Sequence, residues 1–410
     1  TKVVAERISP FAGDPFFSQF FGGFAPTVPR IQNSLGSGVI LSENGIVISN
    51  HHVVGDAKEI RVVLSDRREF NGEILLSDEE ADIAVIQLED ADGLPALELG
   101  DSDAVEVGDL VLAIGNPFGV GQTVTSGIVS GLARSGGHLG NRSGYYIQTD
   151  APINPGNSGG ALVDVHGRLV GINTSILTRS GGSNGIGFAI PSNLVSEYIK
   201  QAREGRAEFV RPWSGILVQE IDSSLSEALG QSIPSGVLIT EIHERSAFRA
   251  AELMPGDVIL SVDELPVNAA SELEFRLATK GPGADVVVEF QRRGVVETVA
   301  VTLAVAPDEP ESVPVRIEGL SPFGGLIVAN VNPRLIDKLD LPLDTRGVIV
   351  VSPEGYAGRV GLRPGDLIVR LNGEMIETAD QFAKLASVAA SSWELDVQRA
   401  GQTIRMRIGG

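Results

Sequence analysis

The chain has 410 residues, enough for two or three domains, and a formal net charge of −21 at pH 7. This acidity argues against nucleic acid or an anionic membrane surface as the partner, because both are bound mainly through lysine and arginine. The chain has no cysteine and no HExxH pattern, so disulfides, a catalytic metal and other cofactors are not expected. It also lacks an apolar run of about 18 residues and a signal-peptide pattern, as a trimmed exported protein would.

The first 35 residues open with a short β-like stretch, Lys2–Arg7, and continue into a loop rich in proline, glycine and phenylalanine. Six of the fifteen phenylalanines fall within fourteen residues of this loop. Such a cluster is expected to pack on another surface, either its own domain or another subunit. The candidates for contacts between subunits are Phe16, Phe17, Phe20 and Phe21.

From residue 36 to residue 173, short apolar runs alternate with turn residues about every ten residues, which is typical of a β-barrel or sandwich. The predicted strands are Gly38–Leu41, Gly45–Ser49, Ile60–Leu64, Gly72–Leu76, Ile83–Ile86, Leu110–Ile114, Val124–Leu132, Tyr145–Gln148, Ala161–Val165 and Leu169–Asn173. A short helix over Pro191–Arg203, with Ser192 and Asn193 as candidate caps, closes this region.

Two later segments repeat each other. Met254-Pro-Gly-Asp-Val-Ile-Leu returns as Arg363-Pro-Gly-Asp-Leu-Ile-Val at an offset of 109 residues. A β run precedes each copy and an amphipathic helix follows it: Gly236–Glu241 and Ser271–Thr279 in the first, Gly347–Val351 and Ala379–Ser387 in the second. This pattern predicts a tandem duplication of a module of about 95 residues, with linkers around Gly205–Arg211 and Ala306–Pro314.

Ser158 lies in the glycine-rich stretch Gly156-Asn-Ser-Gly-Gly160. Glycines allow a tight turn and a close approach of substrate, and the N–H groups of Gly156 and Ser158 could point at a developing oxyanion. Taken alone, the stretch fits an exposed glycine-rich turn equally well.

Candidate partners for a serine nucleophile lie upstream. His51 and His52 end a predicted strand, and only one of two adjacent imidazoles can face a given cleft. Asp82, at the start of Asp-Ile-Ala-Val-Ile86, could orient the imidazole, with Asp78 as the competing acid. The order His, Asp, Ser is that of the chymotrypsin arrangement and predicts a serine peptidase. His138, His166 and His243 are expected to face solvent.

With these residues in place, the chain resembles the HtrA/Deg family of serine proteases, in particular the Do-like bacterial members with two PDZ domains. The matching motifs are Leu35-Gly-Ser-Gly-Val-Ile, Ser49-Asn-His-His-Val-Val, Asp82-Ile-Ala-Val, Gly115-Asn-Pro-Phe-Gly, Thr125-Ser-Gly-Ile-Val-Ser, Gln148-Thr-Asp, Asn154-Pro-Gly-Asn-Ser-Gly-Gly and Gly185-Ile-Gly-Phe-Ala-Ile-Pro. The resemblance implies a mainly β fold: a chymotrypsin-like double β-barrel protease domain (1–207) followed by PDZ domains at 211–306 and 313–410. It also makes His52 the catalytic base and His51 a neighbour.

The resemblance assigns further roles by position. It implies an oxyanion hole at Gly156, Asn157 and Ser158, an S1 pocket at Ile176 and Leu177, and activation and sensor loops that carry Asn116, Phe118 and Arg134. It also implies a peptide-binding loop in the first PDZ domain, made of Arg211, Trp213, Ser214, Gly215 and Ile216, to which a peptide would add as a strand. The counterpart in the second PDZ domain is expected at Gly324–Ile327.

The function expected from this resemblance is an ATP-independent periplasmic serine endopeptidase that degrades unfolded proteins after small aliphatic residues. The resemblance also allows chaperone activity beside hydrolysis. The expected partners are unfolded polypeptides, C-terminal peptides at the PDZ grooves, and copies of the chain in a trimer or a multiple of three. The resemblance also implies that the chain begins inside the first protease strand, after a signal peptide that is absent from the sequence. Two alternatives are a chaperone that only holds clients and a narrow protease that cleaves one anti-sigma factor.

Overall fold

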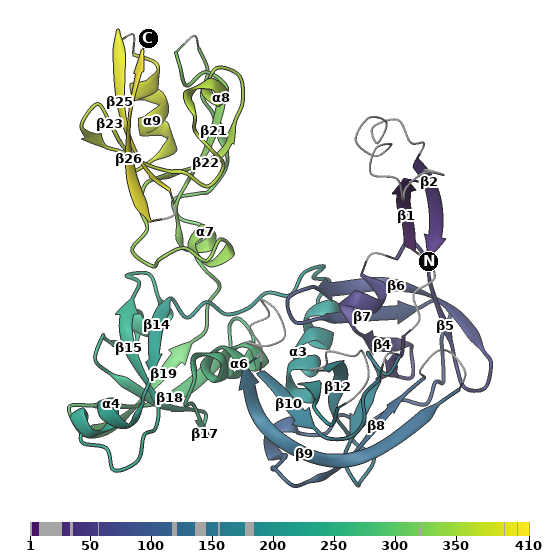
Figure 1. The fold of residues 1–410 in the computed structure, drawn as a ribbon. Coiled ribbons are helices and arrows are strands. Elements are labelled where there is room, and N and C mark those ends of the chain that lie inside the picture. The colour runs from purple at the N-terminus through teal and green to yellow at the C-terminus, as the bar shows by residue number, and fades with distance from the viewer. Residues whose placement is uncertain are drawn as a thin grey trace. The chain divides into compact units, whose positions relative to one another are not determined.

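The computed structural model describes residues 2–7, 27–32, 36–55, 57–116, 121–135, 145–154, 156–176, 184–319, 321–388, 390–399 and 401–409 (Figure 1). Two compact units make up the chain, residues 1–210 with 271–281 and residues 211–270 with 282–410. No helix among the described residues combines the length and apolar character needed to cross a membrane.

The first unit holds three antiparallel β assemblies. These are a β1-β2 pair, a five-stranded sheet in the order β3-β4-β7-β6-β5, and a closed barrel in the order β10-β13-β12-β11-β8-β9. The strands are β1 (Lys2–Arg7), β2 (Thr27–Gln32), β3 (Val39–Ile40), β4 (Ile46–Ser49), β5 (Ile60–Val63), β6 (Glu69–Asp78), β7 (Ile83–Leu88), β8 (Leu110–Gly115), β9 (Thr123–Ser135), β10 (Tyr145–Thr149), β11 (Ala161–Val163), β12 (Leu169–Ile176) and β13 (Gly187–Pro191). The helices are α2 (His51–Val54), the 3-10 turn η1 (Ser102–Ala104), α3 (Ser192–Arg203) and α6 (Ala270–Lys280).

Each strand predicted between residues 36 and 173 has a counterpart in this list. Strand β13 was not predicted, because its two-glycine start, Gly185-Ile-Gly187, weakens the apolar pattern. The predicted cap of α3 is wrong. Pro191 precedes the helix without a side-chain cap, the Ser192 hydroxyl donates to the Gly100 carbonyl, and Asn193 is tied to η1.

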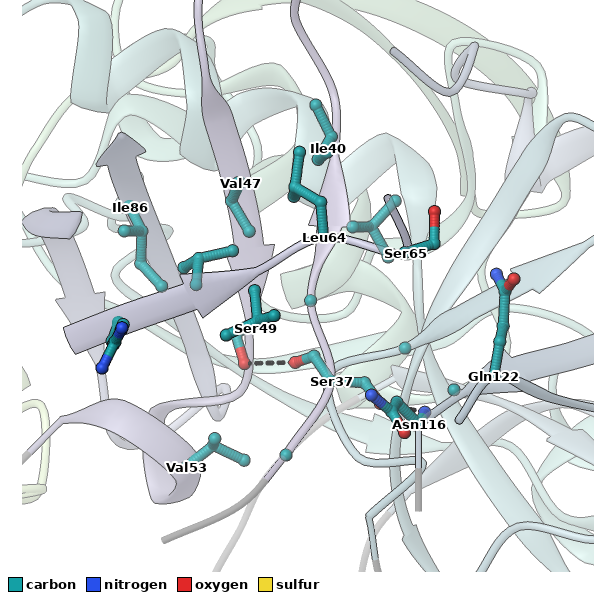
Figure 2. Close-up of a pocket in the computed structure, with 18 of the residues that line it drawn as sticks. Ser37, Ile40, Val47, Ser49, Val53, Leu64, Ser65, Ile86, Asn116 and Gln122 are labelled. Atoms are coloured by element: carbon teal, nitrogen blue, oxygen red, sulfur yellow. Dashed lines mark hydrogen bonds between the residues drawn. The ribbon is translucent and has the colours of Figure 1, made fainter. Parts of the chain in front are cut away.

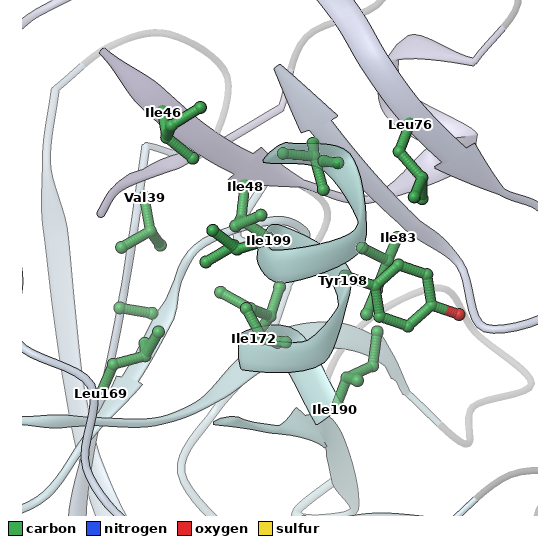
Figure 3. Packing of buried hydrophobic residues seen from close by; sticks show 14 of the residues in the cluster. Val39, Ile46, Ile48, Leu76, Ile83, Leu169, Ile172, Ile190, Tyr198 and Ile199 are labelled. Atoms are coloured by element: carbon green, nitrogen blue, oxygen red, sulfur yellow. The ribbon is translucent and has the colours of Figure 1, made fainter. Parts of the chain in front are cut away.

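A buried cluster joins the five-stranded sheet, the barrel and α3. Tyr198 and Ile199 of α3 lie among Ile48 and Ile83 from the sheet and Ile172 from the barrel (Figure 3). Burial of an aliphatic side chain of this size contributes about 1.5–3 kcal/mol. The sheet and the barrel, which carry different parts of the candidate site, therefore share one core.

The second unit holds two sheets that reflect the duplication. The first has the order β14-β15-β16-β18-β19 with β17 on β16, and the second has the order β20-β21-β22-β23-β25-β26 with β24 on β23. The strands are β14 (Ile216–Glu220), β15 (Val237–Ile242), β16 (Val258–Val262), β17 (Leu265–Pro266), β18 (Asp285–Arg292), β19 (Val295–Thr302), β20 (Val315–Arg316), β21 (Leu326–Asn330), β22 (Val348–Pro353), β23 (Leu367–Leu371), β24 (Glu374–Met375), β25 (Ser392–Arg399) and β26 (Gln402–Gly409). The helices are α4 (Ser223–Ala228), α5 (Ala247–Ala250), α7 (Pro333–Lys338), α8 (Ala357–Val360) and α9 (Ala379–Ala386).

A buried ion pair recurs at matching places of the two sheets. The Arg292 guanidinium donates to Asp257 at 2.7 Å, and the Arg399 guanidinium donates to Asp366 at 2.6 Å. Both aspartates are 1% exposed and belong to the repeated Pro-Gly-Asp motif. The repeat in the sequence is thus a repeat in structure.

Candidate active site

Ser158 lies in the tight turn between β10 and β11. The glycines that follow it allow the turn to pack against neighbouring backbone: a Cβ on Gly159 would lie 2.2 Å from the Ser37 carbonyl oxygen, and one on Gly160 would lie 2.1 Å from that of Ile114. The Ser158 hydroxyl donates to the carbonyl oxygen of Thr174 at 3.1 Å. Within the described residues it makes no hydrogen bond to His52.

His52 and Asp82 are brought together because they adjoin two paired strands of the five-stranded sheet, β4 and β7. His52 lies on α2, and Asp82 lies in the turn between β6 and β7 with φ +59°. Nδ1 of His52 is 2.9 Å and 2.8 Å from the two carboxylate oxygens of Asp82, and the backbone N–H of His52 donates to Oδ1 at 3.0 Å. Asp82 is 1% exposed, whereas the His52 side chain is 43% exposed, so the imidazole has one buried face on the acid and one accessible face.

Thr174 on β12 is a second hydrogen-bond donor to Asp82. Its hydroxyl donates to Oδ2 of Asp82 at 2.6 Å, and both side chains are buried. Burial alone would raise the pKa of Asp82, but the hydrogen bonds from His52 and Thr174 outweigh it and lower the pKa below its usual value. The carboxylate is therefore ionised at neutral pH and fixes the proton of His52 on Nδ1, which leaves Nε2 as an acceptor.

His51 and Asp78, the alternatives to His52 and Asp82, have other partners. Nδ1 of His51 lies 2.7 Å from the Ser77 hydroxyl, and a Cβ on Gly55 would lie 2.3 Å from the His51 ring. Asp78 accepts hydrogen bonds from the Tyr198 hydroxyl and from the backbone of Glu80. The geometry thus pairs His52, not His51, with Asp82, not Asp78.

The turn before Ser158 presents two backbone donors. Gly156 has φ +102°, and neither its N–H nor that of Ser158 donates a hydrogen bond within the described part of the chain. The Asn157 N–H donates to the Asn154 carbonyl at 2.9 Å. Of the three residues expected at the oxyanion hole, Gly156 and Ser158 therefore keep an N–H that donates to no group in the described part of the chain, whereas the N–H of Asn157 is engaged within the turn.

Ser37 connects this turn to the residues that follow β8. Its hydroxyl donates to the Gly156 carbonyl at 2.7 Å and accepts from the Asn116 N–H, also at 2.7 Å. Its carbonyl accepts from the Ser49 hydroxyl at 2.7 Å, a contact drawn in Figure 2. Ser37 therefore holds the orientation of the Gly156–Asn157 peptide group from outside the turn.

A pocket with a cavity volume of about 1510 Å³ opens beside His52. Figure 2 shows that Ser37 and Asn116 lie at one end of it and the apolar side chains of Ile40, Val47 and Leu64 at the other. Its lining thus combines a polar end with an apolar one, as is common for ligand pockets.

Several expected site residues lie outside the described residues: Phe16, Phe17, Phe20, Phe21, Phe118 and Leu177. For Arg134 on β9 and Ile176 on β12, only the backbone is described. No group of three or more His, Asp or Glu side chains that could hold a metal ion occurs in the described part of the chain.

The peptide-binding loop expected in the first repeat leads directly into β14. Gly215 has φ +61°, Ile216 begins the strand, and Ser214 and Arg211 precede them. Trp213 is 7% exposed, and its backbone N–H donates to the Ala304 carbonyl at 2.8 Å. The expectation that His243 faces solvent is wrong: its ring packs edge-on against Trp213 with centroids 5.2 Å apart, and burial lowers its pKa.

The sequence reasoning missed Thr174 and Ser37 as parts of the site. Thr174 follows Asn173 in a strand that is buried from Leu169 to Thr174, and a buried hydroxyl requires a hydrogen-bond partner, so a signal existed. Ser37 lies in a glycine-rich stretch with no comparable signal.

Comparison with known proteins agrees with this geometry. Residues 36–172 match the trypsin-like peptidase domain, and residues 213–303 and 347–399 each match a PDZ domain. The periplasmic serine endoprotease DegP of Escherichia coli K12 is 37% identical over 399 residues, which cover 97% of this chain and 81% of that protein. The chain belongs to the HtrA/DegP family of serine endoproteases.

Two further HtrA/DegP relatives support the assignment. A probable DegP-like periplasmic serine endoprotease of Pseudomonas fulva is 39% identical over 390 residues, which cover 91% of this chain and 79% of that protein. The solved structure of the HtrA-type protease AlgW with a decapeptide has 38% identity and a TM-score of 0.53, covering 75% of this chain and 93% of AlgW. The expected resemblance, the mainly β fold with two PDZ domains and the serine endopeptidase activity are confirmed.

Proposed function

We propose that this chain is an ATP-independent endopeptidase of the bacterial periplasm that degrades unfolded or misfolded proteins. The observation that carries the proposal is the buried, ionised Asp82 bonded to Nδ1 of His52, with Ser158 in a turn stabilised by Thr174 and Ser37. The periplasmic location rests on the names of the relatives, which are periplasmic proteases.

The proposed mechanism uses Ser158 as nucleophile and His52 as base. The Ser158 hydroxyl turns from the Thr174 carbonyl to Nε2 of His52, gives up its proton and attacks the carbonyl carbon of the substrate peptide bond. The N–H groups of Gly156 and Ser158 stabilise the negative oxygen that forms. His52 then passes the proton to the leaving amine, and water hydrolyses the acyl group from Ser158 by the reverse sequence of proton transfers.

We infer cleavage after small aliphatic residues such as valine, alanine or isoleucine. A pocket for lysine or arginine requires a buried acid, and the seven residues before Ser158, Ala151–Asn157, contain none. Asp150 accepts a hydrogen bond from the Ile128 N–H at 2.7 Å. Ile176 and Leu177 are the proposed apolar wall of the S1 pocket.

For the rest of the chain we propose the limits 1–207 for the protease domain and 211–306 and 313–410 for the PDZ domains. C-terminal peptides would bind at Arg211–Ile216. The sensor and activation loops would include Arg134, Asn116 and Phe118. Copies of the chain would join into a trimer or a multiple of three through Phe16, Phe17, Phe20 and Phe21. A complete triad favours hydrolysis over a purely client-holding role, although chaperone activity is compatible with the same clefts.

The direct test is digestion of casein by the purified chain without ATP, with and without a serine-directed phosphonate. We expect fragments that end mostly in valine, alanine or isoleucine, and complete loss of digestion with the phosphonate. Fragments that end mostly in lysine or arginine would contradict the specificity, and digestion that needs ATP would contradict the proposed role.

A further inference from the structure

We propose that the peptide-binding groove of the second PDZ domain is occupied by the chain's own segment Val315–Ile317, which acts as an internal ligand. Val315 and Arg316 form β20, which pairs antiparallel with β21, and Ile317 follows directly; without β20, β21 would be the edge strand of the sheet. PDZ domains bind peptides by the same kind of strand addition at a sheet edge. A peptide from outside can therefore bind here only after β20 has left.

The hydrogen bonds of β20 are those of a bound C-terminal residue. The Ile317 N–H donates to the carbonyl of Leu326, the first residue of β21, at 2.8 Å. The Ile317 carbonyl accepts from the Gly325 N–H, in the loop before β21, at 2.9 Å. The carbonyl group of Ile317 therefore occupies the position in which this loop would hold the terminal carboxylate of a bound peptide. Two residues back, Val315 is paired with Val328.

The side chain of Ile317 fills an apolar site. Ile317 is 1% exposed and belongs to one buried cluster with Phe323 from the loop, Leu326 from β21 and Phe382 from α9. Phe323 and Phe382 pack edge to face with centroids 5.4 Å apart. A site lined in this way takes a peptide with an aliphatic last residue.

The segment that leads into β20 is fixed along the same strand. Asp308 accepts hydrogen bonds from the Asn332 side chain at 2.7 Å and the Ser312 hydroxyl at 2.6 Å. Farther along, the Asn330 side chain donates to the Glu311 carbonyl at 2.8 Å. The stretch expected to be a linker, Ala306–Pro314, is therefore anchored at the far end of β21 and delivers Val315–Ile317 in register.

The first PDZ domain differs at the matching strand. Within the described residues, β14 pairs only with β15, so its other edge carries no strand of this chain. The segment before β14 does not pair with it, since the backbone N–H of Trp213 donates to the Ala304 carbonyl. The two repeats thus differ in whether the edge strand is already paired.

Tethering makes this internal ligand hard to displace. With an effective concentration on the order of 1 mM and an affinity on the order of 10 µM for the same sequence, a free peptide is weakened about 100-fold. The first domain would then respond to dilute peptides and the second only to abundant ones.

The test counts binding sites in the full chain carrying Ser158→Ala, so that it is independent of hydrolysis. The probe is a fluorescent hexapeptide with the sequence of residues 312–317 and a free terminal carboxylate, and the same peptide with an amidated terminus is its control. Ile317→Pro deletes the N–H donated to Leu326, and the milder Ile317→Ala only shortens the buried side chain. Val313→Ala, at a side chain that is 60% exposed, is the matched control.

We expect each Ile317 variant to gain one carboxylate-dependent site per chain relative to the parent and Val313→Ala to gain none. In a parallel set of the same chains that carry Trp213→Phe, the fluorescence of Trp393, 2% exposed in the second PDZ core, reports that the domain is folded. An equal number of sites in the parent and in a folded Ile317→Ala chain, at affinities within threefold, would overturn the proposal. Hydrogen exchange gives a second measure: the Ile317 and Gly325 amides must be protected in the parent, and rapid exchange of both would overturn it too.

Discussion

The hydroxyl of Thr174 lies 2.6 Å from the carboxylate of Asp82, and the carbonyl of the same threonine accepts the hydroxyl hydrogen of Ser158 at 3.1 Å. One residue of β12 thus contacts both the orienting acid and the nucleophile. Thr174 belongs to the barrel, and Asp82 lies in a turn of the five-stranded sheet. Their hydrogen bond therefore connects the two parts of the site.

Replacement of Thr174 by valine is expected to lower kcat about 10- to 100-fold, because a hydrogen bond to a charged group contributes about 1.5–3 kcal/mol. KM should change little, and Thr174→Ser should restore most of the rate. Thr302→Val is the control, because it removes a threonine hydroxyl that bonds to Asp285 on an exposed hairpin. A Thr174→Val enzyme with wild-type kcat would show that the bond has no role in catalysis.

The adjacent histidines are expected to behave differently. His52→Ala removes the base and should reduce hydrolysis about as much as loss of the nucleophile, whereas His51→Ala breaks only the contact with Ser77 and should leave most of kcat intact. Steady-state kinetics on both variants, with circular dichroism as the check of folding, decides between them. The opposite ranking would make His51 the base.

Ser37→Ala should reduce kcat with little effect on KM, since the serine hydroxyl fixes the carbonyl of Gly156 while the neighbouring N–H groups stabilise the oxyanion. Loss of one neutral hydrogen bond corresponds to about 0.5–1.5 kcal/mol, or roughly a 2- to 10-fold fall. Ser42→Ala removes a hydroxyl that accepts from Ile46 in the β3–β4 turn and serves as control. Equal rates for the two variants would contradict the role given to Ser37.

Asp308, in the segment that leads into the second PDZ domain and is bonded to its Asn332, supplies a pH prediction for that domain. Hydrogen bonds from the side chains of Ser312 and Asn332 lower its pKa from 3.8 to about 2. Because the folded pKa lies below the unfolded one, its contribution to stability is fully present above about pH 4 and is lost as the pH falls towards 2. In a Trp213→Phe background, Trp393 is the only tryptophan left to report unfolding.

Urea unfolding gives the free energy of unfolding of the Trp213→Phe chain with and without Asp308→Asn. The difference between the two chains should be constant from pH 7 to about pH 4 and should shrink below pH 4. Asp344→Asn, at an exposed aspartate of the same domain, is the control. A difference that does not change with pH would mean that the Asp308 carboxylate is not held as described.

The sequence predicted those parts of the fold that depend on local pattern. The alternation of apolar runs located the strands of the barrel, and the repeated Pro-Gly-Asp motif located both PDZ sheets. The triad of His52, Asp82 and Ser158 could be predicted from the sequence because each residue lies in a short motif of its own. Thr174, Ser37 and the β20–β21 pair were not predictable in the same way, because they depend on which distant segments meet and two-residue strands leave no periodicity.

The rate of peptide hydrolysis by the Ser158→Ala chain tests whether Ser158 is the nucleophile of a triad with His52 and Asp82. We expect kcat to fall about 10⁶-fold with the fold intact by circular dichroism. We also expect a phosphonate to label the wild-type chain at Ser158 alone, as read by mass spectrometry of the adduct. Retention of more than a few per cent of the activity, or a stoichiometric adduct on another residue, would show that Ser158 is not the nucleophile.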